Sequence, residues 1–234
     1  FFQALAGGHT VSTSLPAPWD VIALWEQVLL ESDELVYIPM SSGLSSACST
    51  AVGLANEYEG RVFVVDNHRI SESLKSSVLD ALALREAGCG AREIQRELEA
   101  SAYDSIAYAG VETMEHLRRG GRIGRITALA GTMLSIKPIM HTSDEGKLTV
   151  VGKARGRKSS LNTLIDTVGR LGINLQDQVM FICQADCQAE AETVAAQLKQ
   201  RYGVKEVYIN YIGPVIGSHT GPNTMGLFFV GTER

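Results

Sequence analysis

The first half of the chain alternates short apolar runs with longer amphipathic segments, a pattern typical of parallel α/β domains. The runs at 35–40 and 61–66 are almost wholly apolar and end in turn residues, so they predict buried strands. Helices are expected at 19–30, 45–58, 71–86 and 91–99. This order of elements predicts a doubly wound parallel sheet with helices on both of its faces.

In the second half of the chain, the pattern predicts more strands than helices. Strands are expected at 105–111, 136–141, 147–153, 178–184, 206–211 and 226–230, and helices at 160–169 and 189–200. The turn residues 142–146 favour a hairpin, which requires antiparallel pairing. We therefore predict two domains. Residues 1–102 form the parallel α/β domain, and residues 103–234 form a two-layer α/β domain with a mixed, largely antiparallel sheet.

Composition and charge narrow the range of functions. The formal net charge of -5 argues against a nucleic-acid partner, which would need a basic face. No run reaches the roughly 18 apolar residues of a membrane span, and no signal peptide is evident, so we expect a cytoplasmic protein without stable membrane insertion. The four cysteines form no CxxC pair and no metal-binding spacing, which predicts idle thiols and no metal site.

Three polar segments could carry chemistry. His219 lies in the apolar run 213–222, where its ring nitrogens need a polar partner. Ser41 and Ser42 lie between a predicted strand and a helix, a position where free backbone N–H groups bind anions. Thr13 lies in a hydroxyl-rich loop just before Leu15-Pro16. Each segment also has a structural interpretation, as a buried histidine, a helix cap or a polar turn. Together they predict hydroxyls and an imidazole that converge on one carboxylate.

Two other features allow different interpretations. Serine and histidine with Asp66 as an orienting acid would suit a serine hydrolase, but the chain lacks the G-x-S-x-G elbow of that class. Basic clusters at 118–125 and 153–158 are either solvated faces or patches that steer a phosphate-bearing partner.

Several spaced motifs resemble those of the DegV family of bacterial fatty-acid-binding proteins. They run in register along essentially the whole chain: Thr13-Ser14-x-Pro16, Ser41-Ser42-x-Leu44-Ser45, Val65-Asp66, Leu117-x-x-Gly120-Gly121-Arg122-Ile123, Ile136-Lys137-Pro138-Ile139, Lys153-x-Arg155, and Gly213-Pro214-Val215 with His219-x-Gly221.

This resemblance implies a non-catalytic lipid carrier. A long-chain fatty acid would lie in an apolar tunnel, with its carboxylate held by Thr13, Ser41, Ser42 and His219. The resemblance also implies that the protein is the lipid-carrying subunit of a fatty acid kinase. It would present the carboxylate to a separate ATP-dependent kinase subunit, which makes acyl phosphate for phospholipid synthesis. The resemblance makes Arg155 a candidate for kinase contact or for control of fatty-acid exchange. No cofactor beyond the bound fatty acid is implied.

The chain also departs from the family pattern. Ser46 and Ala47 replace a glycine and a hydroxyl residue, and Asn223 stands where a small glycine is common. The family has a further strand–helix–strand unit ahead of Phe1, so we expect the first domain to be truncated at its N-terminus. Met133, Leu134 and Ile136 are candidates for the tunnel lining. The fold is also similar to the substrate domain of dihydroxyacetone kinases, which leaves a hydroxy-ketone-binding kinase-type subunit as the alternative.

Overall fold

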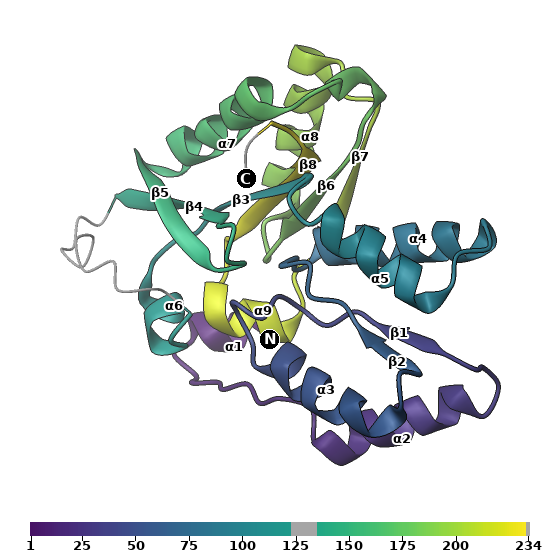
Figure 1. Cartoon of the computed structure of the whole chain (residues 1–234). Helices are drawn as coiled ribbons and strands as arrows, with labels where there is room; N and C mark the ends of the chain where they lie inside the picture. The colour runs from purple at the N-terminus through teal and green to yellow at the C-terminus, as the bar shows by residue number, and fades with distance from the viewer. Residues whose placement is uncertain (123–134, 233–234) are drawn as a thin grey trace. The chain divides into compact units, whose positions relative to one another are not determined.

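The computed structural model describes residues 1–122 and 135–232, and the chain divides into two compact units (Figure 1). Unit 1 comprises Phe1–Thr13, Asp104–Ser143 and Lys147–Arg234, and unit 2 comprises Ser14–Tyr103 and Asp144–Gly146. The change of unit after Tyr103 lies beside the seam expected at 102. Residues 1–13 nevertheless pack in unit 1, because Phe2 and Leu5 are buried in an apolar cluster of that unit.

Unit 2 is built on a two-stranded parallel sheet. Strand β1 (Leu35–Tyr37) pairs with β2 (Val62–Val64), with Leu35 opposite Val62. Its helices are α2 (Pro18–Leu29), α3 (Ala47–Ala55), the 3-10 turn η1 (Asn56–Tyr58), α4 (Glu72–Glu86) and α5 (Ala91–Ala100). The parallel pairing and the four α-helices confirm the predicted parallel α/β architecture of this part of the chain. Both strands are shorter than predicted, and Pro39, which lacks a backbone N–H, follows β1 closely.

Apolar side chains cover both faces of this small sheet. On one face, Trp25 of α2 is 1% exposed and packs with Val62, Val64 and residues of α3. On the other face, Val65 packs with Ile94 and Leu98 of α5. Because both faces are buried, the strands consist almost entirely of apolar residues, as in other parallel sheets.

Unit 1 is built on a six-stranded mixed sheet in the order β5-β4-β3-β8-β6-β7, in which only β6 and β7 pair in parallel. The strands are β3 (Ser105–Gly110), β4 (Ile136–Thr142), β5 (Leu148–Arg155), β6 (Val179–Gln184), β7 (Glu206–Tyr211) and β8 (Met225–Val230). The helices are α1 (Phe2–Ala6), α6 (Glu115–Arg119), α7 (Arg157–Leu171), α8 (Gln188–Tyr202) and α9 (Pro214–Thr220), with a 3-10 turn η3 (Leu175–Asp177). The β4–β5 hairpin confirms the predicted antiparallel pairing.

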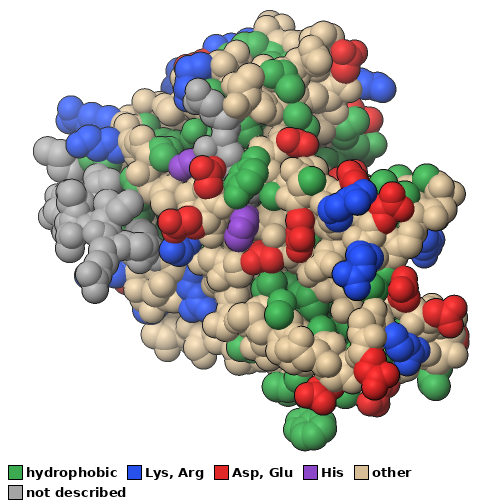
Figure 2. All heavy atoms as spheres, viewed as in Figure 1, with side chains coloured by type: hydrophobic (Ala, Val, Ile, Leu, Met, Phe, Trp, Pro, Cys, Tyr) green, Lys and Arg blue, Asp and Glu red, His purple; other side chains and the backbone are tan. Residues whose placement is uncertain are grey.

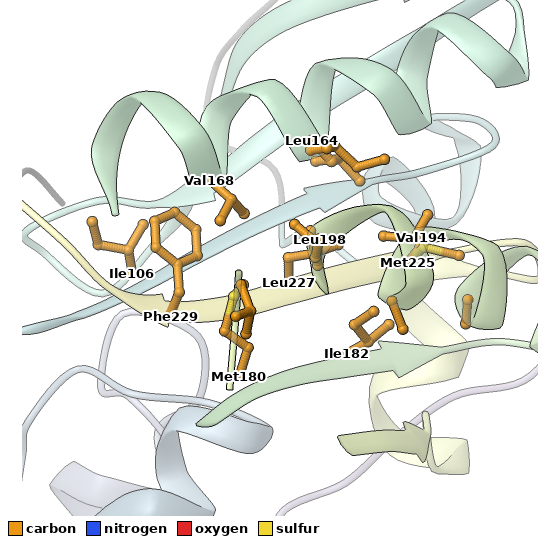
Figure 3. Close-up of a cluster of buried hydrophobic side chains, with 14 of the residues drawn as sticks. Ile106, Leu164, Val168, Met180, Ile182, Val194, Leu198, Met225, Leu227 and Phe229 are labelled. Atoms are coloured by element: carbon orange, nitrogen blue, oxygen red, sulfur yellow. The ribbon is translucent and has the colours of Figure 1, made fainter. Parts of the chain in front are cut away.

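The largest core of unit 1 lies between this sheet and the long helices α7 and α8. Leu164 and Val168 of α7 point toward Leu227 and Phe229 of β8, as Figure 3 shows, and all four side chains are buried. A second cluster on α1 and the sheet contains Phe2, Leu5 and Phe228, with Ile216 of α9 packed against it. Helices therefore cover both faces of the sheet, the long pair on one and the short pair on the other.

Two short helices, α6 and α9, were not predicted, and both bear on the site. The glycines and proline of 213–222 obscure the helical pattern of α9. Pro214 nevertheless suits the first helical turn, because an N–H there has no intrahelical partner. Gly221 ends the helix with a φ of +79°. His219 thus lies on the last turn of a helix. Among the described helices, none has the length and apolar character needed to cross a membrane.

Candidate functional site

Thr13 and His219 lie together in unit 1 although 206 residues separate them in the sequence. The hydroxyl oxygen of Thr13 lies 2.8 Å from Nε2 of the His219 imidazole, and both side chains are partly buried. Thr13 ends the N-terminal segment that follows α1, and His219 lies near the end of α9. This part of the predicted cluster is therefore within hydrogen-bond distance.

The surroundings of the ring determine where its proton lies. Nδ1 of His219 is buried and has no hydrogen-bond partner among the described residues. A proton on Nδ1 would leave a buried donor unsatisfied, so we assign the proton to Nε2. Nε2–H then donates to the Thr13 oxygen, and the Thr13 hydroxyl keeps its own proton free for another acceptor. The pair can therefore donate a hydrogen bond to an anion.

The surroundings of the imidazole favour its neutral form. Burial lowers the pKa of His219 below its ordinary value of 6.5, and the positive charge of Arg122 lowers it further. Neutral imidazole keeps one donor and one acceptor nitrogen, which fits the assignment above. With a neutral imidazole, the free donor of this pair is the hydroxyl proton of Thr13.

Ser41 has a structural role in unit 2, on the loop between β1 and α3. Its side chain is 1% exposed, and its hydroxyl donates to the carbonyl oxygen of Gly146 at 2.8 Å. The same oxygen accepts the N–H of Gly43 at 3.1 Å. A side chain at Gly43 would lie 2.6 Å from the carbonyl carbon of Gly146, so the two backbones approach closely. The Ser41 proton is therefore committed to the β4–β5 turn.

Ser42, in contrast, is exposed, and its backbone N–H donates to Oδ1 of Asp66 at 3.3 Å. Asp66 also lies 3.4 Å from Nδ1 of His68. The carboxylate of Asp66 therefore supports the backbone of the serine loop, while the loop leaves the Ser42 side chain at the surface of unit 2. Sequence analysis did not anticipate the contributions of Gly146 and His68. The sequence signal for this turn is the glycine itself. Gly146 has a φ of +69°, which glycine adopts readily.

The geometry around His219 does not match a serine hydrolase triad. In a triad, one ring nitrogen contacts a serine nucleophile and the other contacts a carboxylate. Here Nε2 contacts the threonine Thr13, and Nδ1 has no carboxylate partner in the described part of the chain. The carboxylate of Asp66 is used by Ser42 and His68.

The remaining predicted residues are placed as follows. Arg155 is exposed at the end of β5, opposite Ile136. Ile136 is half-buried at the start of β4. Met133 and Leu134 lie outside the described residues, as does the part of the first basic cluster after Arg122.

On the face shown in Figure 2, acidic and basic side chains are interspersed. All four cysteines are free thiols, and the described residues contain no group of metal-binding side chains.

Apolar clusters anchor α9, which carries His219, and the neighbouring helix α6. Ile216, one turn before His219 on α9, packs against the cluster of Phe2 and Phe228. Another apolar cluster contains Leu117 of α6 and Met140 of β4. Helix α6 in turn contacts α9. Both helices next to His219 are therefore held to the rest of unit 1 by buried apolar side chains.

The fold and the site define an α/β protein that has a parallel sheet, a mixed sheet and a hydroxyl–imidazole pair formed by Thr13 and His219. The sequence model of the DegV family, described as a family of uncharacterised proteins, matches residues 1–232. The chain belongs to the DegV family.

Individual relatives agree with this assignment. A DegV domain-containing protein of Clostridium perfringens is 33% identical over 239 residues, which cover 100% of this chain and 82% of the relative. The solved structure of a DegV family protein from Thermus thermophilus, described by its fatty acid binding, is 30% identical with a TM-score of 0.86. The match covers 99% of this chain and 83% of that one. A DegV lipid-binding protein from Thermotoga maritima is 26% identical with a TM-score of 0.82, covering 97% and 79% of the two chains.

Proposed function

We propose that this protein binds a long-chain fatty acid and holds its carboxylate with the side chains of Thr13 and His219. The observation that carries the proposal is the 2.8 Å contact between these two side chains. It leaves the hydroxyl proton of Thr13 free for an anionic acceptor. The fatty-acid-binding relative from Thermus thermophilus, with 30% identity over nearly the whole chain, supports the choice of ligand.

Ser42 is a further candidate donor to the carboxylate in this proposal, because its side chain is exposed while its backbone is held by Asp66. Ser41 acts indirectly in this proposal, since its proton is committed to Gly146. Its hydrogen bond would fix the loop on which Ser42 stands. The carboxylate would then accept hydrogen bonds from hydroxyl groups, without a full positive charge beside it.

The acyl chain supplies most of the affinity in this proposal. About fourteen buried methylenes at roughly 0.8 kcal/mol each give about 11 kcal/mol of gross transfer free energy. Association and ordering of the chain offset several kcal/mol of this. The apolar residues around α9, such as Phe2 and Ile216, are suited to contact the methylenes. Neutral donors then need only to position the head group, and they leave the carboxylate nucleophilic.

A nucleophilic carboxylate suits transfer of a phosphoryl group, which depends mainly on positioning and on the metal and nucleotide of the transferring enzyme. We therefore propose that the protein is a non-catalytic carrier in the cytoplasm that presents its fatty acid to an ATP-dependent kinase subunit for acyl-phosphate formation. Arg155, exposed at the end of β5, is a candidate contact for that subunit. The free cysteines are compatible with a reducing compartment.

Lipid analysis tests the proposal directly. Protein purified from a bacterial host would be examined by native mass spectrometry and by gas chromatography of its extracted lipids. We expect one fatty acid per chain, and rebinding of palmitate after delipidation. His219→Ala should weaken palmitate binding, whereas Ser12→Ala, which removes an exposed hydroxyl next to Thr13, should not. A purified protein that carries no fatty acid and does not bind palmitate would refute the proposal.

A further inference from the structure

The helices α6 and α9 interlock through two histidines and two glycines. His219 of α9 lies against Gly120, the residue that ends α6, and His116 of α6 lies against Gly221, the residue that ends α9. Each imidazole therefore occupies the space that a side chain on the other helix would fill. Both Nδ1 atoms are buried and have no hydrogen-bond partner in the described part of the chain.

Gly120 has no backbone reason to be glycine. Its φ and ψ are -76° and -7°, a conformation that any residue adopts at the end of a helix. The contact supplies the reason: a Cβ atom at position 120 would overlap Nδ1 of His219 and lie 2.8 Å from its Cε1 atom. Gly121 is the reverse case. Its φ of +67° favours glycine, but a Cβ atom there would meet nothing within 4 Å.

The backbone at Gly120 is held in place. The Gly120 N–H donates to the carbonyl of His116 at 2.9 Å, and the Arg122 N–H donates to that of Leu117 at 3.1 Å. Leu117, a residue of α6, is fully buried and anchors this helix. A side chain added at position 120 would therefore displace the imidazole more readily than the turn.

We propose that Gly120 is a positioning residue for the carboxylate site, because its bare backbone sets the orientation of the His219 ring and so aims Nε2 at Thr13. This inference rests on the proposed role of His219 in fatty-acid binding. In this proposal the two neighbouring glycines have different roles. Gly120 leaves space for the His219 ring, and Gly121 allows the backbone to turn. Arg122 follows directly, and its hydrogen bond to the Gly120 carbonyl at 2.8 Å ties its charge to the same turn.

Two alanine variants in one turn test this proposal. Gly120→Ala adds a methyl group where the ring lies, and Gly121→Ala adds the same group where there is open space but the backbone is strained. Long-range nitrogen–proton NMR spectra of delipidated protein, assigned with His219→Ala, report the tautomer and surroundings of the His219 ring. We expect shifted His219 resonances in Gly120→Ala and unchanged ones in Gly121→Ala. Palmitate binding by calorimetry should weaken about tenfold or more in Gly120→Ala, the effect of one misplaced hydrogen bond to a charged group.

A double-mutant cycle separates positioning from a general structural effect. In the His219→Ala background, Gly120→Ala should cause no further loss of palmitate binding, because the ring through which it acts is absent. Equal losses with and without His219, or equal effects of the two glycine variants, would overturn the inference. The NMR comparison needs no ligand, so it decides the positioning role even if the wild-type protein does not bind palmitate. Unchanged His219 resonances in Gly120→Ala would refute that role.

Discussion

Replacing Thr13 by valine isolates the hydroxyl that the proposed site depends on. Valine keeps the branched shape of threonine but has a methyl group in place of the hydroxyl, so the contact with His219 Nε2 is lost. In the empty protein this leaves the Nε2–H donor without an acceptor. Because the pair is only partly buried, water recovers part of the loss, and we expect destabilisation of about 1 kcal/mol.

The effect of Thr13→Val on binding is the difference between two terms. The complex loses a hydrogen bond to a charged group, worth about 1.5–3 kcal/mol. The freed Nε2–H of His219 can turn to the carboxylate instead, which returns part of that free energy. We therefore expect the dissociation constant for palmitate to rise by roughly tenfold, or about 1.4 kcal/mol.

Isothermal titration of delipidated protein with palmitate measures this change. Thr13→Ser is the matched control, since it restores the hydroxyl and should bind within about threefold of wild type, about 0.6 kcal/mol. Ser12→Ala, one residue earlier and exposed, should have no effect. If Thr13→Val binds palmitate as tightly as Thr13→Ser does, the hydroxyl does not hold the carboxylate and the site has been misassigned.

Three further predictions concern the serine loop, the buried histidines and the cysteines. Ser41→Ala should lower the melting temperature through loss of the bond to Gly146, whereas Ser42→Ala should weaken palmitate binding without a comparable thermal effect; the reverse pattern would contradict the roles assigned. Burial lowers the pKa values of His116 and His219 below 6.5, so the unfolded chain binds protons first on acidification. The free energy of unfolding from urea titrations should therefore fall as the pH falls below 6.5, and less steeply when both histidines are glutamine. Iodoacetamide should alkylate Cys89 before the three buried thiols, as peptide mapping would show.

Much of the fold could be predicted from the chain because its strands are strongly patterned. The apolar run at 206–211 became β7 with the predicted bounds, and the runs at 136–141 and 147–153 became the β4–β5 hairpin. Such elements are specified locally, by apolar residues bounded by turn residues. The short helices α6 and α9 were missed because five and seven residues are too few to establish a 3.6-residue period.

The candidate site could also be predicted from the sequence only in part. Hydroxyls and histidine are visible as residue types, but the contact between Thr13 and His219 joins opposite ends of the chain and has no local signal. Residue types and the motif resemblance, not periodicity, led the sequence analysis to group these two residues. The commitment of Ser41 to Gly146 depends on the tip of a hairpin 105 residues away. No pattern around the serines distinguishes Ser41 from Ser42, so sequence analysis treated them as equivalent donors.

A neutral donor pair also bears on how a fatty acid would be selected and released. An arginine in place of His219 would form a charged pair with the carboxylate, which is costly to break once buried. A hydrogen bond from the Thr13 hydroxyl, which the neutral imidazole orients, holds the head group less firmly, at about 1.5–3 kcal/mol. Differences in affinity between fatty acids would then come from the apolar contacts of the chain, at roughly 0.8 kcal/mol per methylene. In this arrangement the head-group donors fix the register of the ligand, and the hydrophobic residues decide which acyl chain fits that register.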